Sequence, residues 1–253
     1  MAARLKPDRV VYLYGITETL PSEIPELVGV DRFASVESLA CEGVVCWISW
    51  VSALDFDENL PQNMENLDWL AETSVAHQRV ISAIAGEAEI LPARLGTIFR
   101  NEASLCKHIA KRARSLKRDF KRIEGADEWG VKVFQVRPAI TLPKVRSGKD
   151  YLQAKAALLP SRRKTEGNGD IRRLERALDN LATEVAPGGN MSRGQRGVEF
   201  QTTLLVKRSN RKKLESLLEK FARDWEQERR IECTGPWPPY SFVSRPDEGV
   251  KSK

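Results

Sequence analysis

Few residues in this sequence could carry acid–base chemistry. The chain of 253 residues holds two histidines, His77 in "SVAHQRVI" and His108 in "SLCKHIAK". Histidine is the usual general base near neutral pH, and a hydrolase also needs a nucleophile within its reach. Both histidines stand in segments of helical spacing, where a packing role is the more frequent one. Because no GxSxG, HExxH or DxDxDG-type motif is present, we expect a non-enzymatic protein. An enzyme would need a pocket that joins His77 to a carboxylate.

The cysteines do not form a metal-binding pattern. Cys41, Cys46, Cys106 and Cys233 include no CxxC pair, and no histidine stands at a spacing typical of zinc sites. Free cysteine is among the most frequently buried residue types. We therefore expect four small, buried hydrophobic side chains and no metal.

Two other segments resemble ligand-binding loops in composition only. The glycine-rich stretch 187–197 follows a predicted helix and precedes a predicted strand, which reverses the strand–loop–helix order of phosphate-binding loops. The acidic stretch "ALDFDENLPQNMEN" (53–66) lacks the glycine and the final glutamate of an EF-hand loop. We predict a linker and a solvated loop, and we expect no cofactor.

Charge is unevenly distributed along the chain. Residues 1–100 contain 7 Lys and Arg against 15 Asp and Glu, a net charge of −8. Subtraction from the totals of 41 and 35 leaves 34 against 20 for residues 101–253, a net charge of +14. The basic part either meets an acidic surface or consists of solvated helix faces, and both interpretations stay open.

A nucleic-acid-binding module is the alternative from another functional class. The predicted helix over 107–122 carries eight Lys and Arg residues and could neutralise several phosphates. No RNP-type aromatic strand, GXXG clamp or recognition helix accompanies it, and Glu124, Asp127 and Glu128 dilute the basic charge. We therefore expect no nucleic-acid partner.

The hydropathy pattern favours a cytoplasmic protein without a membrane contact. No apolar run approaches the ~18 residues that a membrane-spanning helix needs. The N-terminal "MAARLKPDRVVYLYGI" lacks an apolar signal core that ends in a small-residue cleavage site.

The first half of the chain begins with predicted strands. "RVVYLYGI" (9–16) and "CEGVVCWISWV" (41–51) have the β-branched and aromatic composition of strands. The second of these can pair with the segment before it, 30–38, through a turn at Glu42 and Gly43.

Two predicted helices follow, with an extended segment between them. Apolar residues from Asn66 predict a helix that ends near Gly86. "AEILPARLGTIF" (88–99) is typical of an edge strand or bulge, because Pro92 interrupts it. Asn101 is a suitable N-cap for an amphipathic helix that ends at Gly125. The apolar stripe of that helix consists of Leu105, Ile109, Leu116, Phe120 and Ile123.

The second half predicts strands separated by helices. "EWGVKVFQV" (128–136), "VEFQTTLLVKR" (198–208) and "RRIECTG" (229–235) are the strands. One helix begins at "SGKDYLQAKAALL", is interrupted over 160–170, and then resumes. Its seam consists of Ile171, Leu174, Leu178, Leu181 and Val185, and the stripe of the next helix consists of Leu214, Leu217, Leu218, Phe221 and Trp225.

These patterns together predict an α+β protein of two α/β-sandwich domains. The domains are residues 1–125 and residues 126–235. The βαβαβ order of the second domain favours a ferredoxin-like sandwich. One strand of that fold is not recognisable in the sequence. A Pro- and aromatic-rich tail, 236–253, follows and must run extended, because prolines fix φ and restrict the residue before them.

Seven sequence blocks, taken in order, resemble the GvpL/GvpF family of gas vesicle proteins. The blocks are "YLYGI" (12–16), "LDWLAETSVAHQRVI" (67–81), "LPARLGTIF" (91–99), "EWGVKVF" (128–134), "GKDYL" (148–152), "TTLLVKR" (202–208) and "TGPWPPYSFV" (234–243). The closing block is the most distinctive. The chain departs from the pattern in "GKDYL", where Arg-Glu is expected in place of Lys-Asp, and in the unusually basic stretch 155–173.

The resemblance implies an accessory protein for the assembly of gas vesicles, the hollow protein shells that make some prokaryotic cells buoyant. It implies two α+β domains, the second related to the ferredoxin fold, and no catalysis. The implied partners are the major gas vesicle shell protein and other accessory gas vesicle proteins, and the implied location is the gas vesicle in the cytoplasm.

A partner surface follows as a hypothesis from that resemblance. The shell subunit must be strongly apolar on its gas-facing side, so it is an aggregation hazard before assembly. "RLGTIF" could supply a sheet edge for it, and the tail aromatics either pack against the protein, which we favour, or form an exposed recognition strip. Arg94 and Arg100 could instead form a salt bridge to a local carboxylate such as Glu87 or Glu89. The candidate partner-binding residues are Arg94, Leu95, Ile98, Phe99, Arg100, Trp237, Tyr240 and Phe242.

Overall fold

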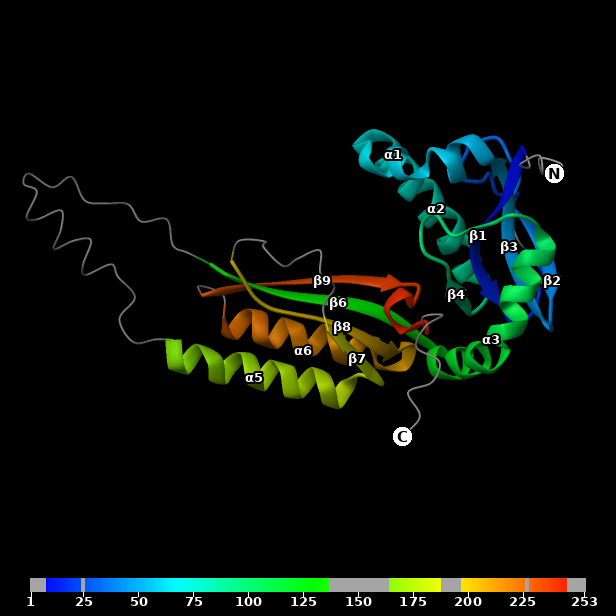
Figure 1. The fold of residues 1–253 in the computed structure, drawn as a ribbon. Helices are drawn as coiled ribbons and strands as arrows, with labels where there is room; N and C mark the ends of the chain where they lie inside the picture. The colour runs from blue at the N-terminus through cyan, green and yellow to red at the C-terminus, as the bar shows by residue number, and fades with distance from the viewer. Residues whose placement is uncertain (1–7, 24–25, 137–163, 188–196, 226–227, 245–253) are drawn as a thin grey trace, which may run out of the picture. The chain divides into compact units, whose positions relative to one another are not determined.

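The computed structural model describes residues 8–23, 26–136, 164–187, 197–225 and 228–244 (Figure 1). The chain divides into two compact units. Unit 1 comprises the described residues of Met1–Glu128 and Pro236–Lys253, and unit 2 those of Trp129–Gly235. The predicted helix start at "SGKDYLQAKAALL" lies outside the described residues. Among the described helices, none combines the length and the apolar content that a membrane crossing requires.

Unit 1 contains an antiparallel sheet built around the predicted first strand. β1 (Arg9–Thr17) pairs with β3 (Val44–Ser52) on one side and with the short strands β4 (Ile90–Pro92) and β5 (Ile98–Phe99) on the other. β2 (Glu37–Cys41) pairs with β3, which gives the order β2-β3-β1-β4, with β5 beside β1. The prediction of a broken edge strand over 88–99 is therefore confirmed.

A tight turn between β2 and β3 corrects the predicted strand 41–51. Cys41 pairs with Val44, so the chain reverses over Glu42 and Gly43, the turn that the sequence indicated. Both turn residues have positive φ, 51° and 80°. Two-residue hairpin turns need this backbone because its twist matches that of the flanking strands. The predicted strand thus begins at Val44, and Cys41 ends the preceding one.

Helices occupy the stretch 53–66, for which the sequence analysis predicted a solvated loop. η1 (Leu54–Glu58), a π-helix, is followed by α1 (Leu60–Glu65), which has a proline in its first turn. Proline is favourable there because the first helical N–H groups have no intrahelical partner. The loop prediction was wrong because it was based on the acidic composition alone and did not consider the proline as a helix start signal.

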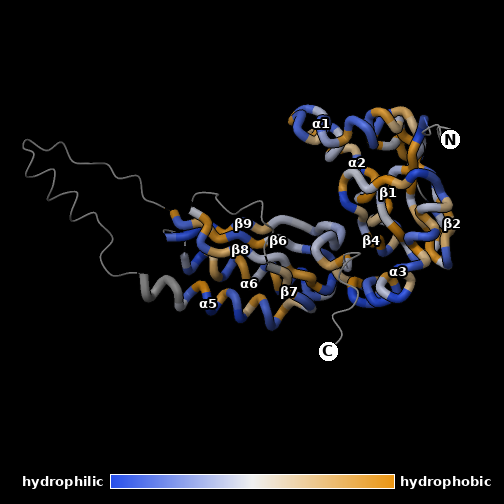
Figure 2. Tube along the Cα trace, viewed as in Figure 1, coloured by the Kyte–Doolittle hydropathy of each residue, from blue (hydrophilic) through white to orange (hydrophobic). Residues whose placement is uncertain are grey.

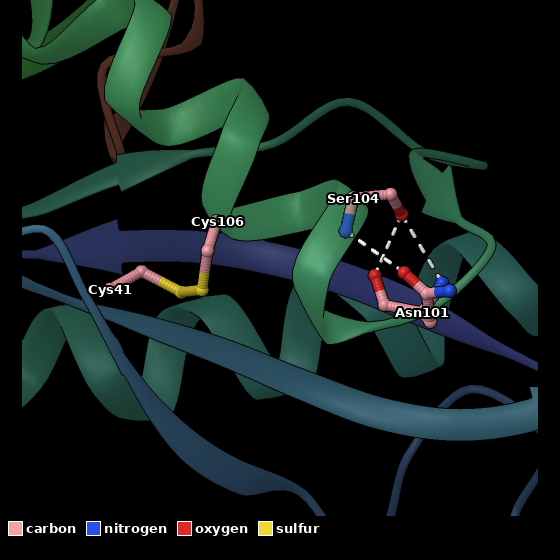
Figure 3. The surroundings of a disulfide bond; sticks show 4 residues. All are labelled: Cys41, Asn101, Ser104 and Cys106. Carbon is pink, nitrogen blue, oxygen red and sulfur yellow. Dashed lines mark hydrogen bonds between the residues drawn. A yellow bond between two sulfur atoms is a disulfide. The ribbon is translucent and has the colours of Figure 1, made fainter.

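Two long helices of unit 1 confirm the predicted spans, and each begins at an asparagine cap. α2 (Leu67–Glu87) starts after Asn66, whose side chain accepts hydrogen bonds from the backbone N–H groups of Asp68 and Trp69. α3 (Glu102–Ile123) starts after Asn101, which forms a reciprocal capping box with Ser104 (Figure 3). Such caps satisfy backbone donors that would otherwise lack partners at the helix start.

The two long helices cover opposite faces of the sheet (Figure 1). α2 packs on the face that carries Tyr12 and Tyr14, because side chains alternate along β1 and these two residues share one side. The cluster on this face includes Val10, Tyr12, Tyr14, Val51, Phe56, Ala76, Val80, Ile81 and Ile84. The buried stripe of α3, predicted from the sequence, lies outside that cluster, so α3 covers the other face.

A disulfide corrects the prediction of four buried, unpaired cysteines. Cys41, at the end of β2, is bonded to Cys106 in the first turns of α3 (Figure 3). Cys46 is free and buried in β3, whereas Cys233 is free and exposed. Sequence spacing could not show the pairing, because 65 positions separate the two bonded residues. The bond ties an edge strand to the helix that covers the sheet.

Unit 2 combines a four-stranded sheet with two helices. In chain order its elements are β6 (Ala126–Gln135), α5 (Lys164–Leu181), β7 (Glu184–Pro187), β8 (Val198–Lys207), η3 (Arg208–Asn210), α6 (Arg211–Asp224) and β9 (Arg229–Trp237). The strand order is β7-β8-β6-β9. The core consists of one face of the sheet with the helix stripes, including Val131, Val133, Leu174, Leu178, Leu204, Leu214, Leu218 and Phe221.

β7 is the strand that the sequence analysis did not detect. The helical seam ends at Leu181, and Val185 instead lies in β7, paired with Leu204 of β8. The β-branched Thr183 and Val185 and the restriction that Pro187 places on the residue before it disfavour a further helical turn. The predicted interruption over 160–170 is also wrong for residues 164–170, which are helical despite Gly167 and Gly169. Glycine lowers helix propensity by only about 1 kcal/mol, which tertiary packing overrides.

The predicted start of an extended tail at residue 236 also needs correction. β9 continues through Pro236 to Trp237, two residues past the predicted end of the strand. A short 3₁₀ turn, η4 (Tyr240–Phe242), follows in place of continuous extended chain. Proline excludes a helix interior but is compatible with the residue just before a turn of this kind.

Candidate partner-binding surface

The residues from Ile90 to Phe99, here named the edge segment, form the outer border of the unit 1 sheet. β4 and β5 pair with β1 and with no other strand in the described part of the chain. Between them, Ala93 N donates to Tyr14 O at 2.8 Å and Leu13 N donates to Thr97 O at 2.9 Å. Gly96 has a φ of 75°, a conformation that glycine adopts readily, and lies in the loop between the two short strands, which run in the same direction along β1.

A buried polar network holds the edge segment from beneath. His77 of α2, only 4% exposed, lies 2.9 Å from the Tyr12 hydroxyl through Nδ1 and 3.2 Å from Ala93 O through Nε2. A carbonyl only accepts, so Nε2 carries the proton and Nδ1 accepts from Tyr12. The Tyr12 oxygen in turn accepts from Gly96 N at 3.1 Å. Ala93 and Gly96, both in the loop between β4 and β5, are thus hydrogen-bonded to the same histidine–tyrosine pair.

The electrostatics of this network oppose catalysis by His77. Burial lowers the pKa of His77 to about 4, because the charged imidazolium would lose its hydration. Burial likewise raises the pKa of Tyr12. The two ring nitrogens of His77 contact a phenol and a backbone carbonyl, so the carboxylate partner that an enzyme would need is not there. The predicted packing role of His77 agrees with this geometry.

Five of the predicted partner-binding residues lie in or next to the edge segment. Arg94 and Arg100 are exposed, and Leu95 is half-buried. Ile98 packs against the α2-side cluster, and the Phe99 ring lies 5.2 Å from the ring of His108. Apolar side chains with partial exposure, flanked by two arginines, thus follow one border of the sheet.

The alternative interpretation of the two arginines, a local salt bridge, is wrong. Neither Arg94 nor Arg100 forms an ion pair within the residues that the structure describes. Glu89 instead accepts a hydrogen bond from Gly125 N at 3.0 Å, at the end of α3. Both guanidinium groups therefore remain accessible to a partner.

The remaining predicted residues belong to a C-terminal strap, defined here as residues 238–244, which lies on unit 1. The Tyr240 hydroxyl donates to Gln78 Oε1 of α2 at 3.0 Å. Ser241 donates to the Glu128 carboxylate through its N–H at 2.7 Å and through its hydroxyl at 2.9 Å. Phe242 is buried at 2% exposure, whereas Trp237, just before the strap, is 44% exposed.

Asp119 of α3 is the centre of the strap contact. Its carboxylate, in a residue that is 1% exposed, accepts from Ser244 N at 2.9 Å and from Ser244 Oγ at 2.7 Å. Arg122 donates to the same carboxylate at 2.6 Å and also to the backbone carbonyl of Phe242. Arg112 donates to Ser244 O at 2.6 Å. A buried carboxylate that accepts several hydrogen bonds is well satisfied.

The structure therefore separates the eight predicted residues by accessibility. Ile98 and Tyr240 both pack against the α2-side cluster, although 142 positions separate them in sequence. Tyr240 and Phe242 are engaged with unit 1, and the accessible members are Arg94, Arg100 and Trp237. Asp119, Gln78 and Glu128 were not predicted from the sequence as strap contacts. One signal was available, since Asp119 is the only acidic residue in the basic helix between Lys107 and Arg122.

Comparison with known proteins gives one consistent result. A family model described as "Gas vesicle synthesis protein GvpL/GvpF" matches residues 10–244. Gas vesicle protein L of a Streptomyces species is 30% identical over 266 residues, covering 97% of both chains. Gas vesicle protein F of Haloferax mediterranei is 22% identical over 235 residues, covering 92% of both.

Solved structures support the same fold. The crystal structure of gas vesicle protein GvpF from an Anabaena species matches with a TM-score of 0.68 and 19% identity, covering 93% of this chain and 98% of that one. The crystal structure of GvpF from Microcystis aeruginosa matches with a TM-score of 0.65 and 19% identity, covering 93% and 99%. At this identity the likeness concerns the fold, a mixed α/β architecture with two antiparallel sheets.

Proposed function

The chain belongs to the GvpL/GvpF family of gas vesicle proteins, and from this premise we propose that it binds and shields the hydrophobic shell subunit before gas vesicle assembly. A role in gas vesicle assembly follows from the family itself. The proposal adds a partner, the major shell protein, and a mode of action that makes and breaks no covalent bond. It places the protein in the cytoplasm, in contact with other accessory gas vesicle proteins as well.

The edge segment carries this proposal. A sheet border with free backbone groups can accept an added strand from a partner, with main-chain hydrogen bonds giving affinity. Such borders also aggregate unless charge protects them. Arg94 and Arg100 supply that charge, and the half-buried Leu95, Ile98 and Phe99 supply apolar contacts. The Tyr12–His77 network keeps this border rigid, so a partner would not have to order it on binding.

We further propose that the protein forms two domains, the second ferredoxin-like, with the tail completing the first. The β6-α5-β7-β8-α6-β9 succession and the β7-β8-β6-β9 sheet order support a ferredoxin-like assignment for unit 2. The strap contacts support assigning the described residues from Pro236 onward to unit 1, in place of the separate tail 236–253 predicted from the sequence.

The nucleic-acid alternative has no comparable support. Arg112 and Arg122, two of the eight cations of the basic helix, are half-buried and donate hydrogen bonds to the strap. The matching family model and the two relatives named above are gas vesicle proteins.

A test is to dilute denatured shell subunit into buffer with and without this protein and to follow light scattering and co-sedimentation. We expect the wild-type protein to suppress scattering and to remain bound to the subunit. Leu95→Asp should abolish both effects, because it places a charge in the apolar part of the edge segment. Val75→Asp is the matched control, since Val75 is 70% exposed on α2. Circular dichroism verifies that both variants fold.

The outcomes separate two parts of the proposal. If the wild-type protein neither binds the subunit nor lowers scattering, shielding of the shell subunit is refuted. If Leu95→Asp, like Val75→Asp, still binds the subunit and suppresses scattering, the partner binds elsewhere and the edge segment is excluded.

A further inference from the structure

A row of cations follows the outer face of α3, opposite to its buried stripe. Lys107, Lys111, Arg114, Arg118 and Lys121 recur at intervals of three and four residues, so they share one helix face. With Lys117 beside them, these residues form the α3 ridge. At 1.5 Å of rise per residue the ridge is about 21 Å long. All six side chains are exposed.

The α3 ridge lacks counter-charges of its own. None of its six cations forms an ion pair within the described residues of the chain, in contrast to Arg122, which is bonded to Asp119. Arg114, Lys117, Arg118 and Lys121 line one shallow surface hollow. Like charges at these spacings repel one another along a helix, and an opposite charge from outside relieves that repulsion.

The same chain carries a matching acidic surface, here named the acidic end. Asp55, Asp57, Glu65 and Asp68 are exposed on η1, α1 and the first turn of α2, and within the described residues none forms an ion pair. No Lys or Arg occurs between Arg32 and Arg79. Exposed apolar side chains lie among these acids, namely Leu54, Met64 and Leu67. Figure 2 shows both α1 and α3 as largely hydrophilic.

The two surfaces cannot meet within one molecule. α3 covers one face of the β1–β3 sheet, whereas α2 packs on the other, with η1 and α1 preceding it (Figure 1). The ridge of one copy can therefore reach the acidic end only of another copy. The long aliphatic stems of Lys and Arg can cover Leu54, Met64 and Leu67, a contact that a polyphosphate could not offer.

We propose that the protein self-associates head to tail, with the α3 ridge of one copy docked on the acidic end of the next. Two different surfaces form such an interface, so it is heterologous and can extend beyond a dimer. The contact is electrostatic and weakens as salt screens it. This inference is independent of binding to the shell subunit, since it involves neither Leu95 nor the β4–β5 border.

A charge-swap experiment on the full chain tests the interface by sedimentation velocity. The wild type should associate with increasing concentration at about 50 mM salt and dissociate at about 500 mM, where screening is stronger. The ridge variant R114E/R118E and the acidic-end variant E65K/D68K should each be monomeric. Mixed in equal amounts they should associate again, because each surface then meets its opposite charge. K212E/K213E on α6 is the control, since it makes the same charge change on unit 2 and should associate like the wild type.

Each result decides the proposal. Reassociation in the mixture, with monomers for each variant alone, supports a ridge-to-acidic-end contact. A wild type that stays monomeric at low salt overturns it, as does a ridge variant that still associates. Association that disappears after nuclease treatment, with absorbance at 260 nm in the complex, overturns it in favour of a nucleic-acid bridge.

Discussion

At the scale of single residues, unit 1 uses its ionisable side chains for structure. His77 and Tyr12 form a hydrogen bond with each other in the core. Each also bonds to the edge segment, because His77 donates to Ala93 O and the Tyr12 oxygen accepts from Gly96 N. Asp119 does the same for the strap. Buried polar groups of this kind specify one arrangement when every partner is present and destabilise it when one is removed.

Tyr12→Phe tests the network with the smallest change. The substitution removes one oxygen and leaves the buried Nδ1 of His77 and the N–H of Gly96 without a partner. We expect the free energy of unfolding to fall by about 1–3 kcal/mol, measured by urea denaturation. Tyr240→Phe is the matched control, because its hydroxyl contacts only the half-buried Gln78 and its loss should have a smaller effect. Equal losses for the two variants would contradict the network.

Because His77 is buried in its neutral form, the free energy of unfolding should depend on pH. Its pKa in the folded protein is lowered to about 4 from an ordinary value of 6.5. Between these values the unfolded chain binds a proton that the folded chain does not, so stability falls as pH decreases through this window. The loss approaches about 2–3 kcal/mol near pH 4.5. Denaturation of wild type and His77→Gln at pH 7.5 and near pH 4.5 measures it, and parallel losses in both proteins would refute the assignment.

At the scale of elements, the sequence predicted what local signals determine. Apolar stripes located α2 and α3, with Asn101 as the predicted cap of α3, and β-branched runs located β1 and β8. The short strand β7 escaped because Leu181 and Val185 happen to continue a helical spacing, although Pro187 argued against a further turn. Partners distant in sequence could not be predicted either: Tyr12 with His77, Cys41 with Cys106 and Ser244 with Asp119 meet only through the fold.

The disulfide between β2 and α3 should stabilise unit 1. A cross-link that closes a loop of 65 residues restricts the unfolded chain and is worth about 4 kcal/mol in the chain-entropy model. We expect dithiothreitol to lower the melting temperature of the wild type. The double variant C41S/C106S should melt at the same low temperature with or without reductant. Cys233→Ser is the control, since Cys233 is exposed and unpaired, and it should respond to reductant like the wild type. A wild type that is insensitive to reductant would contradict the bond.

The strap should be needed for the stability of unit 1. Truncation after Trp237 keeps β9 but removes every strap contact and leaves the buried Asp119 with Arg122 alone. A loss of about 2–3 kcal/mol is expected, which corresponds to a fall of about 4–12 °C in melting temperature for a chain of this size. Truncation after Ser244 is the control, because all of these contacts are then retained. If both truncations melt like the full chain, the strap does not hold unit 1 together.

At the scale of the whole molecule, each unit has a core of its own. The α2-side cluster draws on β1, β3, η1 and α2, whereas the unit 2 core draws on β6, α5, β8 and α6. The chain passes between the units twice, at Glu128–Trp129 and at Gly235–Pro236. The second passage returns the C-terminal strap to unit 1, so residues far apart in sequence complete one body.

Separate cores predict separate unfolding transitions. Ile84→Ala in unit 1 and Leu178→Ala in unit 2 are matched changes, since both side chains are almost completely buried. Each should destabilise its own unit by about 2–5 kcal/mol through the cavity that it leaves. Calorimetry of the full chain should then show two transitions, with Ile84→Ala and reductant lowering one and Leu178→Ala lowering the other. A single transition that both substitutions shift equally would mean that the two units unfold as one body, since cooperative unfolding spreads any local loss over the whole structure.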